Sequence, residues 1–291
     1  MSVIAAEPAL RPAKPRPQWR RFVQRNPTIV AGGVILGLIA LLAILAPLFA
    51  GDAITMQPAL RLRPPSEVNW FGTDHLGRDV FARTVYGARV SLFVGIAVAT
   101  MSIVCGLFIG LMAGYFRKVD AVVMRLMDGL MAIPAILLAI ALVALTRASV
   151  TAVIVAITIP EIPRVVRLVR AVVLGVREAP YVEAAIAGGT PTWKILIRHI
   201  LPSTIAPLIV QATYICASAI LIEAALSFLG AGTPPEIPTW GNMIAQSRLF
   251  LSRAPWTIFA PGIALALVVL GVNLLGDGLR DRLDPRLARR M

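Results

Sequence analysis

The sequence predicts an all-α polytopic membrane protein with six transmembrane helices and with both termini in the cytoplasm. Three observations lead to this prediction: the composition, the spacing of long apolar runs and the uneven distribution of positive charge. Hydrophobic residues make up 58% of the 291 residues and charged residues only 15%, whereas a soluble domain carries about 25% charged residues. The mean hydropathy is +0.80. Such a chain has small loops and no large soluble domain.

Six apolar segments are long enough to cross a bilayer, since a spanning helix needs about 20 residues. They are residues 28–50, 90–116, 121–145, 150 to about 170, 203–228 and 257–276. The first is longer than the hydrophobic region of a cleaved signal peptide, so we interpret it as a span. Pro134 in the third segment and Pro160 and Pro163 in the fourth predict bends, because proline removes a helical hydrogen bond.

The apolar segments divide the chain into a membrane domain and two tails. Residues 1–26 form a basic cytoplasmic tail, residues 27–280 form the six-helix transmembrane domain, and residues 281–291 form a second cytoplasmic tail. Within the membrane domain we expect an outer loop with an interface helix at 51–89, a cytoplasmic loop at 175–202 and a second outer loop at 229–256.

The distribution of Lys and Arg predicts the orientation. With both termini inside, cytoplasmic segments hold 20 of the 28 basic residues and outer segments hold eight. This bias agrees with the retention of positive charge on the cytoplasmic side of membranes. It also explains the net charge of +13 without a nucleic-acid partner, because the basic residues are scattered between apolar segments.

The sequence holds no pattern typical of a catalytic or metal site, which disfavours a membrane enzyme. Cys105 and Cys216 lie far apart in apolar stretches and His75 and His199 are the only histidines, so we expect neither a disulfide nor a metal centre. None of the three lysines follows a glycine, as the lysine of a phosphate-binding P-loop does. The energy for any driven process must therefore come from elsewhere.

Residues 181–202 form a polar stretch between the fourth and fifth apolar segments. Helix formers at its start give way to Gly188 and Gly189, and glycine accepts the left-handed conformation that ends helices. Thr190 is then positioned to cap a second helix that has Pro191 as its first residue. We expect two short helices with a bend between them, and we expect the proline at the end of the stretch to begin the next span.

Acidic side chains inside apolar segments normally face protein or water, because lipid does not solvate them. Glu161 lies three residues before Arg164, so we expect an ion pair between them, with a place on a solute path as the alternative. Glu223 follows a long uncharged run. It either meets a polar partner on a second subunit or lines the outer part of a solute path, where it would attract a cationic group.

Further charges predict helix ends and pairs. Arg125 and Asp128 are three residues apart, a spacing at which opposite charges pair on one helix face. Arg164, Arg167 and Arg170 also recur every three residues. We interpret them as the cytoplasmic end of the fourth span, with side chains that reach towards lipid phosphates.

Gly106, Gly110 and Gly114 recur every four residues in the second span. This spacing places three small residues on one helix face, where a neighbouring helix can approach closely. We expect the neighbouring helix to come from this chain or from a second subunit.

Residues 181–202 resemble the cytoplasmic loop of permease subunits in binding-protein-dependent ABC importers. The pattern of that family is Glu-Ala-Ala, three residues, Gly, then nine residues and Ile-x-Leu-Pro. The matching residues are Glu183, Ala184, Ala185, Gly189, Leu201 and Pro202, while His199 stands in place of Ile. In the family this loop docks on an ATPase subunit. The resemblance therefore implies that the contact involves Tyr181, Glu183, Ala184, Ala185, Gly189, Thr190, Trp193, Leu201 and Pro202.

Residues 69–92 resemble a signature of oligopeptide and dipeptide ABC permeases, and so do residues 223–230, 238–242 and 273–286. The first of these stretches predicts a turn at 72–74 and then a helix that mixes apolar residues with arginines, which is typical of a membrane interface. We favour a structural role for this stretch over direct contact with a substrate.

The resemblance implies the fold of a type I ABC importer permease in a bacterial inner membrane, forming half of the pathway for peptides or a related small solute. It implies as partners a homologous second permease, two cytoplasmic ATPases and an extracytoplasmic substrate-binding protein. ATP and Mg²⁺ would bind to the ATPases, so this chain has no cofactor and is not itself an enzyme. The alternative is a stand-alone secondary transporter or channel, whose mark would be paired intramembrane charges.

Overall fold

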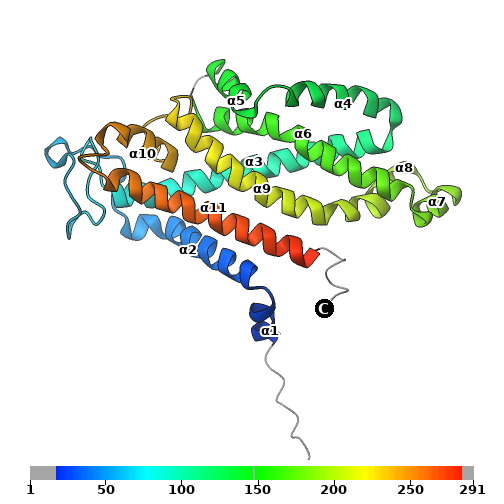
Figure 1. The fold of residues 1–291 in the computed structure, drawn as a ribbon, viewed down its shortest axis with the longest axis horizontal. Coiled ribbons are helices and arrows are strands. Elements are labelled where there is room, and N and C mark those ends of the chain that lie inside the picture. The colour runs from blue at the N-terminus through cyan, green and yellow to red at the C-terminus, as the bar shows by residue number, and fades with distance from the viewer. Residues whose placement is uncertain (1–17, 147, 284–291) are drawn as a thin grey trace, which may run out of the picture.

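The structure is a computed structural model that describes residues 18–146 and 148–283. The regular structure in these residues is helical, apart from one isolated bridge between Thr73 and Asp79. The long helices run roughly along the long axis of the molecule, with α7 and α8 at one end and α10 at the other (Figure 1).

The described residues contain eleven α-helices and three short helical segments of other types. The helices are α1 (Gln18–Arg25), α2 (Pro27–Phe49), α3 (Val80–Tyr115), α4 (Arg117–Met131), α5 (Ala135–Ala144), α6 (Val150–Arg177), α7 (Pro180–Ala187), α8 (Thr192–Lys194), α9 (Leu201–Phe228), α10 (Trp240–Ser247) and α11 (Trp256–Leu283). The turns are η1 (Pro58–Leu60), the π-helical η2 (Ile195–Ile200) and η3 (Arg248–Phe250).

The core lies where α3, α5, α6 and α9 meet, and it consists mainly of valine, isoleucine and alanine side chains. Helix α2 packs along α11 on one side of the bundle, and α4 and α5 lie on the other side (Figure 1). Many side chains on the outer faces of α2 and α3 are large, apolar and exposed. Such faces suit a helix that borders lipid or another subunit.

Glycines let α3 approach α6 more closely than any larger residue would permit. Cβ atoms added at Gly106, Gly110 and Gly114 would lie 2.4, 2.7 and 2.6 Å from the Cβ atoms of Val165, Val169 and Val173. Side chains cannot approach so closely, so α6 occupies the whole space that the three glycines leave. The structure therefore places this close contact within the chain.

By length and composition, four described helices can cross a membrane: α2, α3, the continuous helix Thr192–Phe228, and α11. Helices α4 and α5 count as a fifth span if the 87° bend between them lies within one crossing. This bend at Pro134 confirms the sequence prediction. Helix α6, the expected fourth span, is not among these helices, and its charged residues lower its hydropathy. It stays helical through Pro160 and Pro163.

The prediction of a separate interface helix that ends at 89 is wrong. The helix begins at Val80, where the Asp79 carboxylate accepts a hydrogen bond from the Phe81 N–H at 3.0 Å, and continues for 36 residues as α3. No proline interrupts it. Gly87 does not end it, because this glycine packs against Trp240 inside the fold.

The predicted ends of the membrane domain also need correction. Helix α11 continues past 276 and 280 to Leu283, so the expected tail 281–291 begins as helix. Helix α1 occupies the end of the expected N-terminal tail. The remaining tail residues, 1–17 and 284–291, lie outside the described residues. The outer loop 229–256 is not irregular throughout, because it contains α10.

We expect Gly110→Leu to destabilise the subunit, because the new side chain must displace Val169 and the α6 backbone. Overpacking of this kind costs about 1–3 kcal/mol. The melting temperature of the purified protein in detergent should fall by several degrees. Gly175→Leu is the matched control, since Gly175 lies in α6 with nothing within 4 Å of its added Cβ. Equal stability of the two variants would contradict a tight α3–α6 contact.

Candidate functional site

Helix α7 ends in a Schellman motif, a common helix-ending pattern of two hydrogen bonds. The Gly189 N–H donates to the Ile186 carbonyl and the Thr190 N–H donates to the Ala185 carbonyl, each at 3.0 Å. Gly189 has φ +75°, which confirms that this glycine supplies the left-handed residue. The prediction that Thr190 caps the next helix is wrong. Thr190 completes the end of α7 instead, and Pro191 precedes α8 without a side-chain cap.

The second half of the loop is continuous with the following span. Helix α8, η2 and α9 form one helix over Thr192–Phe228, so Pro202 does not begin a new segment. The π-helical turn Ile195–Ile200 stands immediately before this proline. A wider turn accommodates a residue that lacks an N–H and would clash with the carbonyl four residues earlier. The second half of the loop, from Thr192 onward, is therefore joined to α9 by unbroken helix.

The loop is anchored on its inner side and apolar on its outer side. Val182 and Ile195 are fully buried in the main core. Tyr181 and Trp193, in contrast, have exposed fractions of 51% and 60%. Among the other predicted contact residues, Glu183, Ala184, Gly189 and Pro202 are exposed, and Ala185, Thr190 and Leu201 are half-buried. Exposed aromatic side chains on a rigid, protruding loop are typical of a protein-binding surface.

A row of polar side chains lies between the antiparallel helices α6 and α9. Glu161 lies within hydrogen-bonding reach of Ser218. One turn further along α6, the Arg164 guanidinium lies over the Tyr214 ring, 5.3 Å from its centroid. The next turn brings Gln211 to the same pocket as Leu168. We call Glu161, Arg164, Ser218, Tyr214 and Gln211 the polar row.

The polar row faces a surface that would be energetically costly to cover with lipid. Glu161 is buried and pairs with Arg164 at 3.2 Å, which confirms the predicted ion pair. The Arg164 side chain is 44% exposed and Tyr214 is 52% exposed. A half-exposed guanidinium within an apolar bundle needs water or another protein as its neighbour. Sequence analysis missed Tyr214 and Gln211, because a single polar residue in an apolar run forms no motif.

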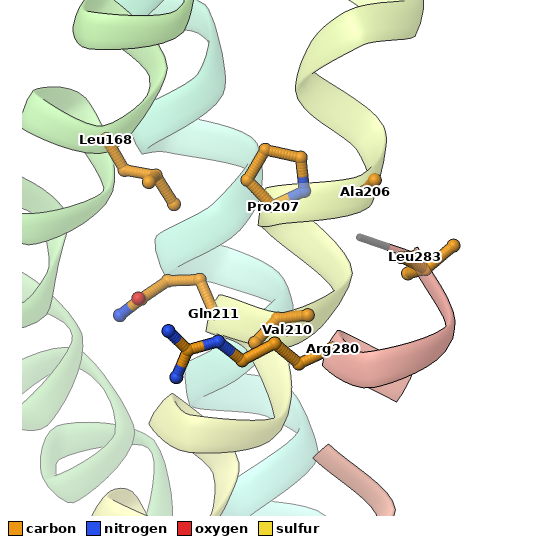
Figure 2. Close-up of a pocket in the computed structure, with 7 residues that line it drawn as sticks. All are labelled: Leu168, Ala206, Pro207, Val210, Gln211, Arg280 and Leu283. Carbon is orange, nitrogen blue, oxygen red and sulfur yellow. The ribbon is translucent and has the colours of Figure 1, made fainter. Parts of the chain in front are cut away.

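A pocket of about 450 Å³ lies at the end of the polar row and is formed by α6, α9 and α11. Its lining residues are Leu168, Ala206, Pro207, Val210, Gln211, Arg280 and Leu283. Figure 2 shows the Gln211 and Arg280 side chains extending into the same space from α9 and α11. The Gln211 Nε2 atom is buried, and it has no hydrogen-bond partner among the described residues.

Arg167 and Arg170 of α6 bind α4 rather than lipid phosphates. Arg167 lies 2.5 Å from the Asp128 carboxylate, and Arg170 pairs with Asp120 through two of its nitrogens. The predicted Arg125–Asp128 pair is therefore replaced by a pair between helices. The α4–α5 bend lays α4 alongside α6, so these carboxylates find arginines across the helix contact.

Glu223 is fully buried, with an exposed fraction of 0%. Its Oε1 accepts hydrogen bonds from the Ser227 and Thr239 hydroxyls, each at 2.9 Å. Thr239 also caps α10 by accepting from the Asn242 N–H at 3.1 Å. In the described structure Glu223 thus joins α9 to α10 through Oε1 and does not face an open surface, whereas its buried Oε2 has no hydrogen-bond partner among the described residues.

The segment 51–79 is held by a second buried carboxylate. Asp74 lies 2.7 Å from the Arg78 Nε and 3.8 Å from the Arg83 Nε.

The Trp240 indole donates to the Thr84 carbonyl at 2.9 Å and so ties α10 to α3. Burial raises the pKa of the Asp79 carboxyl at the start of α3. These contacts give the sequence signature at 69–92 a structural role.

Comparisons with known proteins agree with this architecture. A family model described as binding-protein-dependent transport system inner membrane component matches residues 102–289. A second, described as the N-terminal TM domain of oligopeptide transport permease C, matches residues 17–65. The chain therefore belongs to the family of binding-protein-dependent transport system inner membrane components. It is a permease subunit of an ABC importer and a multi-pass protein of a bacterial inner membrane.

Individual relatives support the same family. A probable peptide ABC transporter permease protein, y4tQ of Sinorhizobium fredii, is 62% identical over 93% of each chain. The dipeptide transport system permease protein DppC of Alkalihalophilus pseudofirmus is 44% identical over 92% of this chain and 90% of its own. A structure of the MetNI methionine ABC transporter in an inward-facing conformation has a TM-score of 0.55 at 21% identity, covering 69% of this chain and 96% of the other. This last likeness concerns the fold alone.

We expect Thr239→Val to destabilise the end of the subunit that contains α10, because it removes the α10 cap and one partner of the buried Glu223 carboxylate. Loss of an N-cap costs about 0.5–2 kcal/mol, and the Glu223 Oε1 atom keeps only the Ser227 hydroxyl as a donor. Thr239→Ser keeps the hydroxyl and serves as the control. Limited proteolysis of segment 229–256 should be faster in the Val variant only. Equal rates in the two variants would show that the hydroxyl contributes no stability.

Proposed function

We propose that this chain forms half of the transmembrane pathway of an importer of peptides. The observation that carries this proposal is the 62% identity, over 93% of each chain, to a probable peptide ABC transporter permease. A relative described as a dipeptide transport permease supports the same substrate class. Glutathione, which contains peptide bonds, is the substrate named for a further relative that is 39% identical.

The energy for transport comes from separate ATPase subunits. Two ATPases, a homologous second permease and an extracytoplasmic binding protein complete the complex. The exposed loop from Tyr181 to Pro202 contacts one ATPase through Tyr181 and Trp193, its exposed aromatic residues. Because the part of the loop that contains Trp193 is helically continuous with α9, a movement of the ATPase at Trp193 reaches the membrane helices without a flexible joint between them.

The orientation follows from the proposed partners and from the charges. The loop and the termini lie in the cytoplasm, and α10 and segment 51–79 lie outside, which requires six spans. Helix α6 then crosses the membrane as one of these spans, despite its charges. The polar row on α6 and α9 lines the pathway between the two permeases, where water solvates Arg164 and Tyr214.

Peptide uptake tests the proposed substrate class. The chain is co-expressed with its partner permease, ATPases and binding protein, and the complex is reconstituted into liposomes. We expect ATP-dependent uptake of radiolabelled di- and tripeptides that requires the binding protein. A complex that assembles and hydrolyses ATP, but imports amino acids or sugars and no peptides, would exclude this substrate class.

A glycine substitution tests the role of the loop. Gly189→Ala forces a side chain into the left-handed conformation at φ +75°, which costs about 1–2 kcal/mol. We expect uptake per ATP hydrolysed to fall, because the loop no longer holds its bend. Gly188→Ala is the control, since Gly188 has φ −76° and accepts a Cβ atom at 3.4 Å from its nearest neighbour. Unchanged coupling in both variants would argue against transmission through this bend.

A further inference from the structure

The pocket at the end of the polar row offers two hydrogen-bond donors to one space. Arg280 enters it from α11 and Gln211 enters it from α9 (Figure 2). The Gln211 Nε2 is buried without a partner among the described residues. A buried donor without a partner costs free energy, so an acceptor that reaches this nitrogen from the pocket would remove that cost.

The charge of the pocket favours an anion. No lining residue is acidic, and none of the ion pairs within the described residues involves Arg280. A guanidinium is the group that best matches the planar geometry of a carboxylate. The neighbouring amide of Gln211 supplies a further donor to such a group.

The other walls of the pocket are apolar. Leu168, Pro207, Val210 and Leu283 lie around the two donors. The pocket volume of about 450 Å³ is within the range of small-ligand sites. It accommodates one amino-acid residue with its carboxylate and several waters. A ligand with a carboxylate next to an apolar side chain therefore fits both parts of the lining.

We propose that this pocket binds the C-terminal residue of a peptide on the inner half of the pathway. Arg280 and Gln211 hold the terminal carboxylate, and the apolar wall receives the side chain. This inference rests on the proposed function, because it requires peptides to pass along α9. A lipid phosphate offers similar oxygens. A terminal carboxylate is favoured because the pocket continues the polar row, and lipid would not solvate the charges of that row.

The test is equilibrium binding to the whole complex in detergent, without nucleotide and without the binding protein. The probe is a radiolabelled tripeptide of two alanines and a C-terminal leucine, compared with the same peptide as its C-terminal amide. Charge-assisted hydrogen bonds predict that the acid binds about tenfold or more tightly than the amide. Arg280→Gln should abolish this preference, and Gln211→Leu should reduce it.

Arg282→Gln is the matched control, since Arg282 lies on the same helix but stacks on Phe22, 4.9 Å from the ring centroid. It should leave the preference unchanged. Arg280→Lys keeps the charge without the fork of nitrogens and should retain part of the preference. Gel filtration shows whether each variant complex assembles. If Arg280→Gln fails to assemble, the Lys and Gln211→Leu variants decide the result.

Several results would overturn the inference. One is equal binding, or no binding, of the two peptide forms by a wild-type complex that imports peptides. Another is an equal loss of preference in Arg282→Gln and Arg280→Gln. A third is loss of co-purified phosphatidylglycerol in Arg280→Gln with peptide binding unchanged, which would identify a lipid site. If the wild-type complex imports no peptide at all, the proposed function fails instead.

Discussion

The close contact between α3 and α6 is the constraint on which the other helix positions depend. Three glycines of α3 receive three valines of α6 with no room for a Cβ atom. This contact fixes the rotation of α6 about its own axis, and so it determines where every other side chain of α6 points. One face of α6 meets α3, a second turns Arg167 and Arg170 towards α4, and a third presents Glu161 and Arg164 to α9.

The two ends of the fold have different chemistry. At one end, the hydroxyls of Ser227 and Thr239 hold the buried Glu223 carboxylate, and a carboxylate at Asp74 holds two arginines. At the other end, the loop around Gly189 exposes aromatic side chains over a buried apolar anchor. Helix α9 connects these ends without interruption.

Local patterns predicted the features that depend on neighbours in sequence. The helix end at Gly189, the bend at Pro134 and the Glu161–Arg164 pair all involve residues within four positions of one another. Among the features that depend on helix packing, the close contact at Gly106, Gly110 and Gly114 was predicted without its partner helix, and others were predicted wrongly or missed. Asp128 pairs with Arg167 across two helices instead of with Arg125. The polar row was missed because its residues come from α6 and α9 and meet only once these two helices are packed.

The sequence alone determined the membrane class, the helical architecture and the family, because apolar runs, charge bias and loop motifs are written in consecutive residues. The tertiary structure decided which polar side chains are buried and which remain exposed. Glu223 and Arg164 are both charged residues in apolar helices, yet one is enclosed by hydroxyls and the other is half-exposed. The physical reason is that burial depends on the rotation of each helix about its axis, and packing against other helices sets that rotation.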